Sequence, residues 1–264
     1  MKDPIILISN DDGVAADGIR NLALAMSHLG QVTVVAPHTD QSAMSHAMSL
    51  RRPLRLFRSA QDLPGQRGPI ACYSVDGTPT DAVYMGVHHV LQSKRPDLIV
   101  SGINHGPNLG NDVLYSGTVS AAMEGVSLGI PSVAFSLVAE HGFNFTHAAT
   151  FARHLCTMLL ATPLPEALLL NVNVPKRLSS PQIVVTKLGR HQYSTDADER
   201  IDPRGQPYYW IGGTWKGYED LPGTDCKAIA DGSISITPLQ MDQTNHAMIP
   251  WLQQLDTTDW QPTK

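Results

Sequence analysis

The chain has little of what would place it in a membrane or disulfide-rich class. Its three cysteines, Cys72, Cys156 and Cys226, lie far apart and form no CxxC pair. This pattern argues against a disulfide framework and is typical of a reducing compartment. No apolar run approaches the roughly 20 residues of a membrane-spanning helix, and the N-terminus lacks the apolar core and cleavage site of a signal peptide. We therefore expect a cytoplasmic protein without membrane attachment.

The chain is also poor in charge, and its excess is negative. Charged residues make up 16% of the 264 residues, the formal net charge is −5, and Lys and Arg form no run. We expect no binding to a nucleic-acid polymer, which needs a basic surface. An anionic ligand would need local positive charge, and this favours a bound metal ion. With 42% hydrophobic residues, the chain can bury one large α/β core, alone or with an extension.

The most informative stretch follows the first apolar run. Residues 5–9, IILIS, are typical of a short buried strand, and the residues that follow, Asn10, Asp11, Asp12 and Gly13, end it abruptly. Neighbouring side chains in a strand point to opposite faces, so the two Asp side chains converge only where the chain turns. Gly13 permits such a turn. In a mainly parallel α/β sheet, ligands bind just beyond the carboxyl ends of the strands.

The Asp pair allows two interpretations. In one, Asp11 and Asp12 hold a hard divalent cation, which prefers oxygen ligands and cancels their mutual repulsion. In the other, one Asp caps the next helix and the other is solvated. The pair alone leaves both open, and the later loops favour the cation.

Strands and helices alternate along the first two thirds of the chain. Apolar runs and stripes predict strands at residues 32–36, 71–75, 97–101, 131–137 and 168–174, and helices at 18–29, 79–91, 119–126 and 147–160. Asp17 is the expected N-cap of the first helix. Thr78 and Asp81 form a capping box at the start of the second, which we interpret as mainly structural. The alternation predicts parallel strands joined by right-handed crossovers.

Two loops should emerge at the same sheet edge as Asp11 and Asp12. The first spans residues 37–49 and offers Ser42, Ser45 and His46 to a ligand. A plain polar connection is the alternative for this loop. His46, like His105 later in the chain, has the chemistry of a proton donor, but each is more typical of a loop histidine without a catalytic role.

The second loop is glycine-rich and begins at Gly102. It carries Asn104 and Asn108, and it ends in Ser116, Gly117 and Thr118 directly before a helix. Glycines allow the backbone to approach a ligand closely, and the free N–H groups of a helix N-terminus favour a phosphate. For residues 116–118 an ordinary N-cap is the alternative interpretation.

The last third of the chain has few helical stripes. Residues 183–213 carry aromatic residues and turn signals, and they predict a long, projecting β-hairpin. Exposed aromatic hairpins usually bury themselves in a partner subunit, so we expect a homo-oligomer. Residues 233–238 predict a late strand, and residues 246–255 predict a short terminal helix.

Together these loops define a site made of oxygen donors. Asp11, Asp12, Ser42 and Asn104 suit Mg²⁺, Mn²⁺ or Ca²⁺. A cation beside helix-terminal amides indicates transfer of a phosphoryl group to water. A nicotinamide enzyme is disfavoured, because its first turn would be GxGxxG rather than two anions. A phosphate-receiving signalling module and a non-catalytic nucleotide-binding protein remain alternatives.

Several long motifs resemble those of the SurE family, the survival-protein nucleotidases. In family order they are ILISNDDG at residues 6–13, VVAP at 34–37, Ser42, DGTPTD at 76–81, SGIN with GPN and SGTVSAAMEG at 101–125, LNVNVP at 170–175 and SITPL at 235–239. The resemblance covers nearly the whole chain. The chain departs from the family's usual charged residues at His38, Thr39 and Gln41.

The resemblance implies an α/β fold with a Rossmann-like, mainly parallel sheet and a C-terminal β-hairpin extension used in oligomerisation. Residues 1–175 would form the phosphatase core and residues 176–264 the extension of a homodimer or homotetramer. It further implies a 5′-nucleotidase that hydrolyses nucleoside 5′-monophosphates, with 3′-monophosphates as a further substrate class, and one Mg²⁺ or Mn²⁺ per subunit.

The resemblance also assigns the site residues. The implied metal ligands are Asp11, Asp12, Ser42 and Asn104, with the two Asp residues catalytic. The implied phosphate-binding residues are Asn108, Ser116, Gly117 and Thr118.

Overall fold

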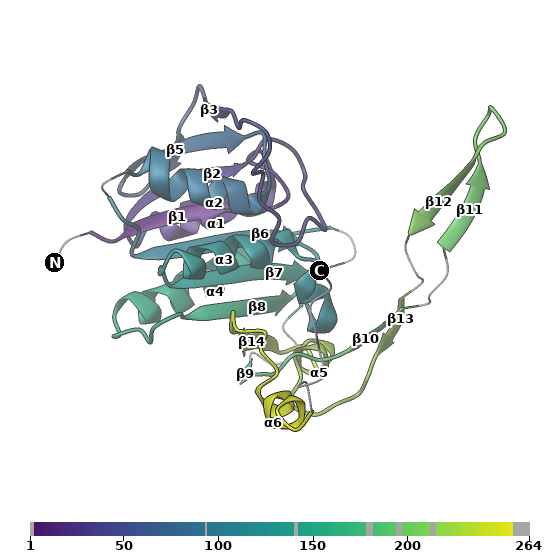
Figure 1. The fold of residues 1–264 in the computed structure, drawn as a ribbon. Helices are drawn as coiled ribbons and strands as arrows, with labels where there is room; N and C mark the ends of the chain where they lie inside the picture. Colours follow the sequence, from purple (N-terminus) through teal and green to yellow (C-terminus); the bar gives the residue numbers. More distant parts are fainter. Residues whose placement is uncertain are drawn as a thin grey trace, which may run out of the picture.

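The fold is built on one large sheet (Figure 1). The computed structural model describes residues 3–92, 94–139, 142–177, 182–193, 197–211 and 215–255. The strands of the sheet are β1 Ile5–Ser9, β2 Gln31–Pro37, β3 Leu56–Arg58, β4 Leu63–Gly65, β5 Gly68–Val75, β6 Leu98–His105, β7 Ser132–Val138, β8 Leu169–Pro175, β9 Ile183–Val185 and β14 Ile234–Pro238. Their order is β3-β5-β2-β1-β6-β7-β8-β14-β9, and β4 pairs with β5.

The central strands follow the order of a doubly wound nucleotide-binding fold. Strands β5, β2, β1, β6, β7 and β8 are parallel to one another, which confirms the predicted mainly parallel sheet. The chain moves outward from β1 to β2 and β5, and it then returns to β6 on the other side of β1. Sheets of this kind bind ligands where the strand order reverses, beyond the carboxyl ends of the strands. Here that point lies between β1 and β6.

Helices cover both faces of the sheet (Figure 1). They are α1 Asp17–Met26, α2 Pro79–Met85, α3 Gly117–Ser127 and α4 Thr146–Leu160. Ile8 of β1 belongs to a core with Leu22 of α1 and Leu155 of α4. Its neighbour Leu7 points to the other face and packs in a core with Val83 of α2. The alternation of apolar side chains along a fully buried strand therefore holds the two helical layers on opposite faces.

Three local expectations for the core differ from the structure. Asp17 is not the N-cap of α1: the turn that begins at Gly13 leaves Ala16 extended as the cap, and Asp17 lies in the first helical turn. The same helix ends at Met26, where the Ser27 hydroxyl donates to the carbonyl of Leu24. Strand β6 continues to His105, so Asn104 lies on a strand and not in a loop.

Beyond β8, some strands extend the large sheet and others pair separately from it. Strands β9 and β14 extend the sheet, with β14 antiparallel to β8. The predicted long hairpin is divided: β9 belongs to the sheet, β10 His191–Tyr193 pairs with β13 Trp215–Tyr218, and β11 Ala197–Ile201 pairs with β12 Pro207–Ile211. Strands β11 and β12 stand away from the sheet in Figure 1.

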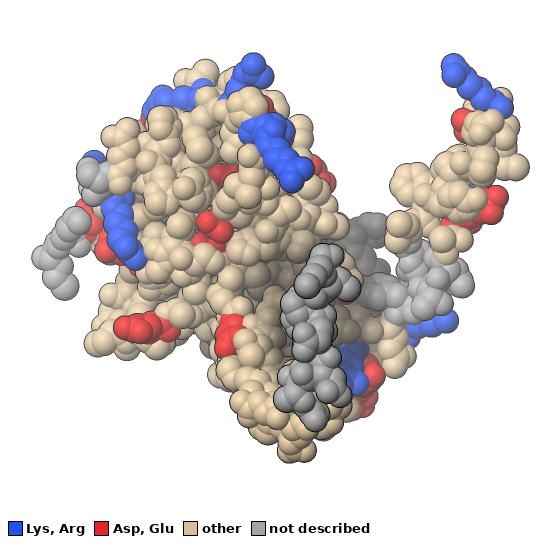
Figure 2. Space-filling view, viewed as in Figure 1, with Lys and Arg blue, Asp and Glu red and all other residues tan. Residues whose placement is uncertain are grey.

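Short helices complete the chain. They are η1 Gly86–Val90 after α2, η2 Gly110–Leu114 before α3, α5 Asp225–Ala230, η3 His246–Met248 and α6 Ile249–Leu252. The last two replace the single terminal helix expected at 246–255. Within the described part of the chain, no helix has the length and apolarity to cross a membrane. On the face in Figure 2, the Lys and Arg side chains lie in separate spots and form no continuous stripe.

Candidate active site

Asp11 and Asp12 lie where β1 leaves the sheet. Gly13 has a φ of +97°, a backbone conformation that favours glycine, and its carbonyl accepts a hydrogen bond from the Asn10 side chain at 3.0 Å. Asp11 is 4% exposed, and the Asp12 side chain is 15% exposed. The turn at Gly13 was predicted from the sequence, and it brings two neighbouring carboxylates to the point where the strand order reverses.

The start of α3 packs directly on Asp11. The Thr118 hydroxyl donates to Oδ1 of Asp11. A Cβ atom at Gly117 would lie 2.6 Å from Asp11 Cβ and 2.9 Å from Oδ2, so only glycine fits without displacing the carboxylate. Two of the residues predicted to bind phosphate thus contact a predicted metal ligand.

The Asp11 carboxyl has an unusual affinity for its proton. Burial raises its pKa from the ordinary value of 3.8 to about 6, hydrogen bonds from Thr118 oppose the rise, and the negative charge of Asp12 adds to it. Neither Asp11 nor Asp12 forms an ion pair with Lys or Arg within the described residues. A buried carboxyl beside a second acid is stabilised in its charged form by a cation.

Asp12 faces His105 at the end of β6. Its Oδ2 atom accepts a hydrogen bond from the His105 backbone N–H at 3.3 Å and lies 3.0 Å from His105 Nδ1. The ring nitrogen is close enough for a hydrogen bond but is not aligned for one, so the contact is an ion pair only when His105 is protonated. The imidazole packs edge-on against Phe143 and Phe145, with ring centroids 5.0 and 4.7 Å away.

The loop that carries Ser42 is attached to the same turn. The Gln41 N–H donates to the Asp11 carbonyl at 2.8 Å. Ser42 itself is exposed, and its N–H and hydroxyl both donate to Asp40 Oδ1, at 2.7 and 2.6 Å. Ser42 therefore comes directly after Gln41, which contacts Asp11, while the Ser42 hydroxyl is hydrogen-bonded to Asp40.

The two predicted asparagines occupy different environments. Asn104 lies beside His105 at the end of β6, and its side-chain nitrogen donates to the Gly106 carbonyl at 3.0 Å. Asn108 is buried, and its side chain donates to the Ser136 hydroxyl at 2.8 Å. Asn104 thus comes directly before a residue that contacts Asp12, whereas Asn108 is held in a polar cluster between β7 and β8.

Ser116 is the N-cap of α3. Its hydroxyl accepts a hydrogen bond from the Val119 N–H at 3.1 Å, and its own N–H donates to the Asp112 carbonyl at 3.2 Å. The capping interpretation therefore describes the Ser116 side chain, while Gly117 and Thr118 form the part of the helix start that meets Asp11.

The donor set fits a hard divalent cation. Within the described ranges, no three His, Cys, Asp or Glu side chains come together as a metal cluster. The predicted ligands are instead two carboxylates, a hydroxyl and a carboxamide, which are the oxygen donors that Mg²⁺ and Mn²⁺ prefer. A buried acceptor, Asn10 Oδ1, has no hydrogen-bond partner among the described residues and lies in this same turn. The chemistry of the site therefore fits the expected cation.

Sequence reasoning missed the residues that hold the glycine-rich loop. The side chains of Asn171 and Asn173 on β8 donate to the Asn108 carbonyl at 2.8 and 2.9 Å. Fully buried Asp225 accepts hydrogen bonds from the N–H groups of Gly110 at 2.9 Å and Gly189 at 2.7 Å. Asparagine in an otherwise apolar strand was the available signal for β8. Asp225 had no comparable signal, because its partners are far away in the sequence.

One cavity of the surface lies away from these residues. A cavity of about 630 Å³ is lined by residues that include Asp3, Ile5, Gln31, Arg95 and Asp97. These residues lie at or near the amino ends of the central strands. The cavity is therefore at the edge of the sheet opposite to Asp11, where doubly wound folds do not place their catalytic groups.

The chain matches the protein family described as "Survival protein SurE" over residues 6–195. It belongs to the SurE family. A SurE relative from Myxococcus xanthus, named "5'-nucleotidase SurE", is 48% identical over 98% of this chain and 94% of its own length. A relative of the same name from Geobacter sulfurreducens is 45% identical over 97% of this chain and 95% of its own length.

A solved SurE structure shares the fold. The structure described as "Crystal Structure of Sure Protein from Aquifex aeolicus" superposes with a TM-score of 0.79 at 38% identity. The superposition covers 95% of this chain and 98% of the Aquifex aeolicus chain. The similarity to SurE proteins therefore extends beyond the region that holds Asp11 and includes the C-terminal part.

Proposed function

We propose that this protein is a 5′-nucleotidase that hydrolyses nucleoside monophosphates to a nucleoside and phosphate. The observation that carries the proposal is the position of the buried Asp11. It lies beside Asp12 where the strand order reverses, and the start of α3 packs against it. The names of SurE relatives at 45–51% identity over most of the chain support the same activity.

Each residue has a defined task in this proposal. Asp11, Asp12, Ser42 and Asn104 hold one divalent cation per subunit, Mg²⁺ or Mn²⁺, which when bound neutralises phosphate charge and polarises the ester bond. The Thr118 hydroxyl fixes the orientation of Asp11. The helix start at Gly117 and Thr118, together with Asn108, orients the phosphate. To act as a ligand, the Ser42 hydroxyl would have to give up its hydrogen bond to Asp40.

A phosphate-release screen tests the function. We expect the purified protein to release phosphate from nucleoside 5′-monophosphates with Mg²⁺ or Mn²⁺, and to lose this activity in excess chelator. The loss should be reversed by adding back the cation. Nucleotide binding without turnover would instead favour a binding protein, and a mass increase with a small phosphodonor would favour a signalling module.

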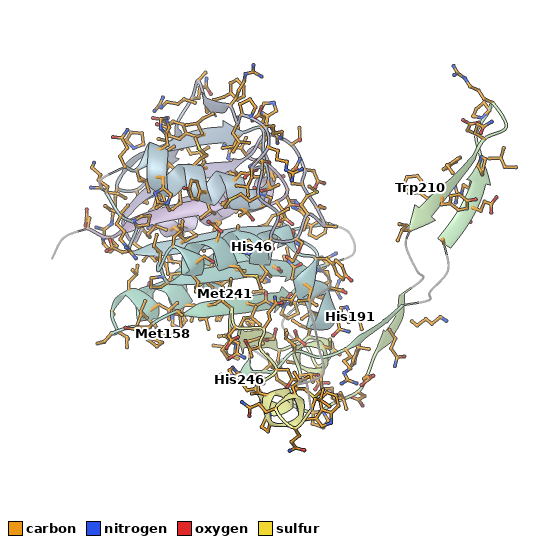
Figure 3. The ribbon with its side chains drawn as sticks, in the orientation of Figure 1. His46, Met158, His191, Trp210, Met241 and His246 are labelled. Atoms are coloured by element: carbon orange, nitrogen blue, oxygen red, sulfur yellow. The ribbon has the colours of Figure 1, made fainter. Side chains whose placement is uncertain are left out.

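We further propose that residues 1–175 carry the chemistry and that residues 176–264 serve assembly into a homodimer or homotetramer. All residues of β11 and β12 are exposed, among them Tyr209, Trp210 and Ile211 (Figure 3 labels Trp210). Such an apolar arm is stable in water when a partner covers it. We also propose a cytoplasmic location, consistent with three free, buried cysteines.

Removing the arm tests the assembly. Replacing residues 197–211 by a short Gly-Ser linker leaves β9 in the sheet and should lower the molar mass measured by light scattering. The double variant Trp210→Ala, Ile211→Ser should have the same direction of effect. An unchanged mass in both variants would refute the role of the arm.

A further inference from the structure

Two segments at the candidate site, the Ser42 loop and the end of η2 with the residue after it, present apolar side chains to solvent. Met44 is 40% exposed, Leu114 is 60% exposed and Tyr115 is 65% exposed. We name these three residues the apolar rim. Scattered apolar residues on a surface need no explanation, but these three lie on the segments that lead to Asp11.

Hydrogen bonds join the two segments of the rim into one structure. The Ser45 N–H donates to the Tyr115 carbonyl at 3.1 Å, and the Ser45 hydroxyl donates to the Leu114 carbonyl at 2.8 Å. Next in the chain, His46 Nε2 lies 3.0 Å from Oε2 of Glu124, a buried residue of α3 (His46 is labelled in Figure 3). The turn that carries Met44 is therefore fastened to the end of η2 and to α3.

The backbone around Met44 is held in an uncommon conformation. Ala43 and Ser45 have φ values of 59° and 52°, in the left-handed region that residues other than glycine rarely adopt. Such conformations persist where surrounding contacts impose them, and they concentrate at ligand clamps. Here the hydrogen bonds of Ser45 supply those contacts, and the result is an outward-facing Met44.

Both halves of the rim are anchored on Asp11. Gln41, three residues before Met44, donates its N–H to the Asp11 carbonyl. Thr118, three residues after Tyr115, donates its hydroxyl to Asp11 Oδ1. Three residues of chain span at most about 10 Å. When a phosphate lies beside Asp11, the group attached to its ester oxygen can therefore reach the rim.

We propose that the apolar rim is the nucleobase subsite, in which Tyr115 stacks on the base of a nucleoside monophosphate and Met44 and Leu114 pack at its edges. This inference rests on the proposed nucleotidase function and adds the group that selects nucleotides among phosphate esters. Stacking on an aromatic ring is tolerant of base identity, so the subsite favours nucleotides as a class.

The test compares two substrates that differ only in the base. For Tyr115→Ala, we expect KM for a nucleoside 5′-monophosphate to rise about 10-fold, within the range expected for loss of one stacked base. KM for ribose 5-phosphate should change less than twofold. Tyr115→Phe should retain the nucleotide KM, because it keeps the ring face. Tyr84→Ala, at a half-exposed tyrosine of α2 whose ring lies beside that of His88, is the matched control and should change neither value.

A binding measurement separates stacking from a general defect. The free nucleoside should inhibit the wild type competitively and should lose this effect in Tyr115→Ala. Equal rises of KM for both substrates, or an unchanged nucleotide KM, would overturn the subsite while leaving the nucleotidase intact. A change of molar mass in Tyr115→Ala with an unchanged KM would assign the rim to a subunit contact. If the wild type released no phosphate from either substrate, the proposed function itself would fail.

Discussion

Replacing Asp11 with Asn is expected to lower phosphate release by on the order of 10³-fold. The substitution keeps the shape of the side chain and an oxygen that accepts from Thr118, but it removes one of the two negative charges at the site. Charge stabilisation by a bound cation contributes several kcal/mol to such reactions, and about 1.4 kcal/mol corresponds to a factor of ten in rate. The measurement is kcat/KM with saturating Mg²⁺ or Mn²⁺, together with cation affinity by calorimetry.

The same variant should be no less stable than the wild type without a cation. In the metal-free wild type, the Asp11 pKa of about 6 in the folded state exceeds its ordinary value of 3.8. Between these values the folded state binds more protons than the unfolded state, so the free energy of unfolding falls as pH rises. The free energy of unfolding falls by on the order of 3 kcal/mol, and the fall is complete above the pKa of Asp11 in the folded state.

Asp11→Asn should lack this pH dependence, as seen by thermal unfolding in chelator between pH 4 and 7. Asp97→Asn is the matched control and should keep the pH dependence that Asp11 causes. Asp97 lies at the opposite edge of the sheet, where it accepts a hydrogen bond from the Ile5 N–H at 2.7 Å, and an Asn side chain can accept the same bond. Full activity in Asp11→Asn at any cation concentration would remove Asp11 from the mechanism.

Local signals predicted most of the core. The IILIS run became β1 with the predicted bounds, and the capping box of Thr78 and Asp81 begins α2 as expected. The hydrogen bonds of that box also hold the Ser42 loop, because Thr78 donates its hydroxyl to the Ala47 carbonyl at 2.7 Å. Ser49 donates its N–H to Asp81 Oδ1 at 2.9 Å. A motif interpreted as structural thus supports the candidate site.

What the sequence left out depends on contacts between distant segments. Asp225 accepts a hydrogen bond from Gly110, 115 positions away, and no pattern near either residue indicates the pairing. Asn171 reaches the Asn108 carbonyl across 63 positions. Helix and strand patterns report which face of an element is buried, but they do not report which polar groups meet inside the fold. The glycine-rich loop was therefore predicted, whereas its supports were not.

Replacing Gly117 with Ala is expected to lower activity by on the order of 10²-fold. Alanine is a better helix former than glycine by about 1 kcal/mol, so helix propensity alone predicts a stabilised α3. The new Cβ would, however, lie 2.6 Å from Asp11 Cβ and 3.1 Å from the ring of Pro79. The carboxylate has to move, and a displacement of about 1 Å at a reacting centre costs such a factor.

Gly125→Ala, in the same helix, separates this effect from general damage. Its Cβ would collide with the Ser132 hydroxyl and approach Ile99 Cδ1 to 2.8 Å, inside the core and away from Asp11. Gly125→Ala should therefore lower the unfolding temperature while the folded enzyme keeps its cation affinity and KM. Gly117→Ala should do the reverse, with weakened cation affinity and a nearly unchanged unfolding temperature in chelator. If both variants lost stability and activity in parallel, close packing of α3 on Asp11 would have only a structural role, and the placement of the phosphate at this helix start would have to be abandoned.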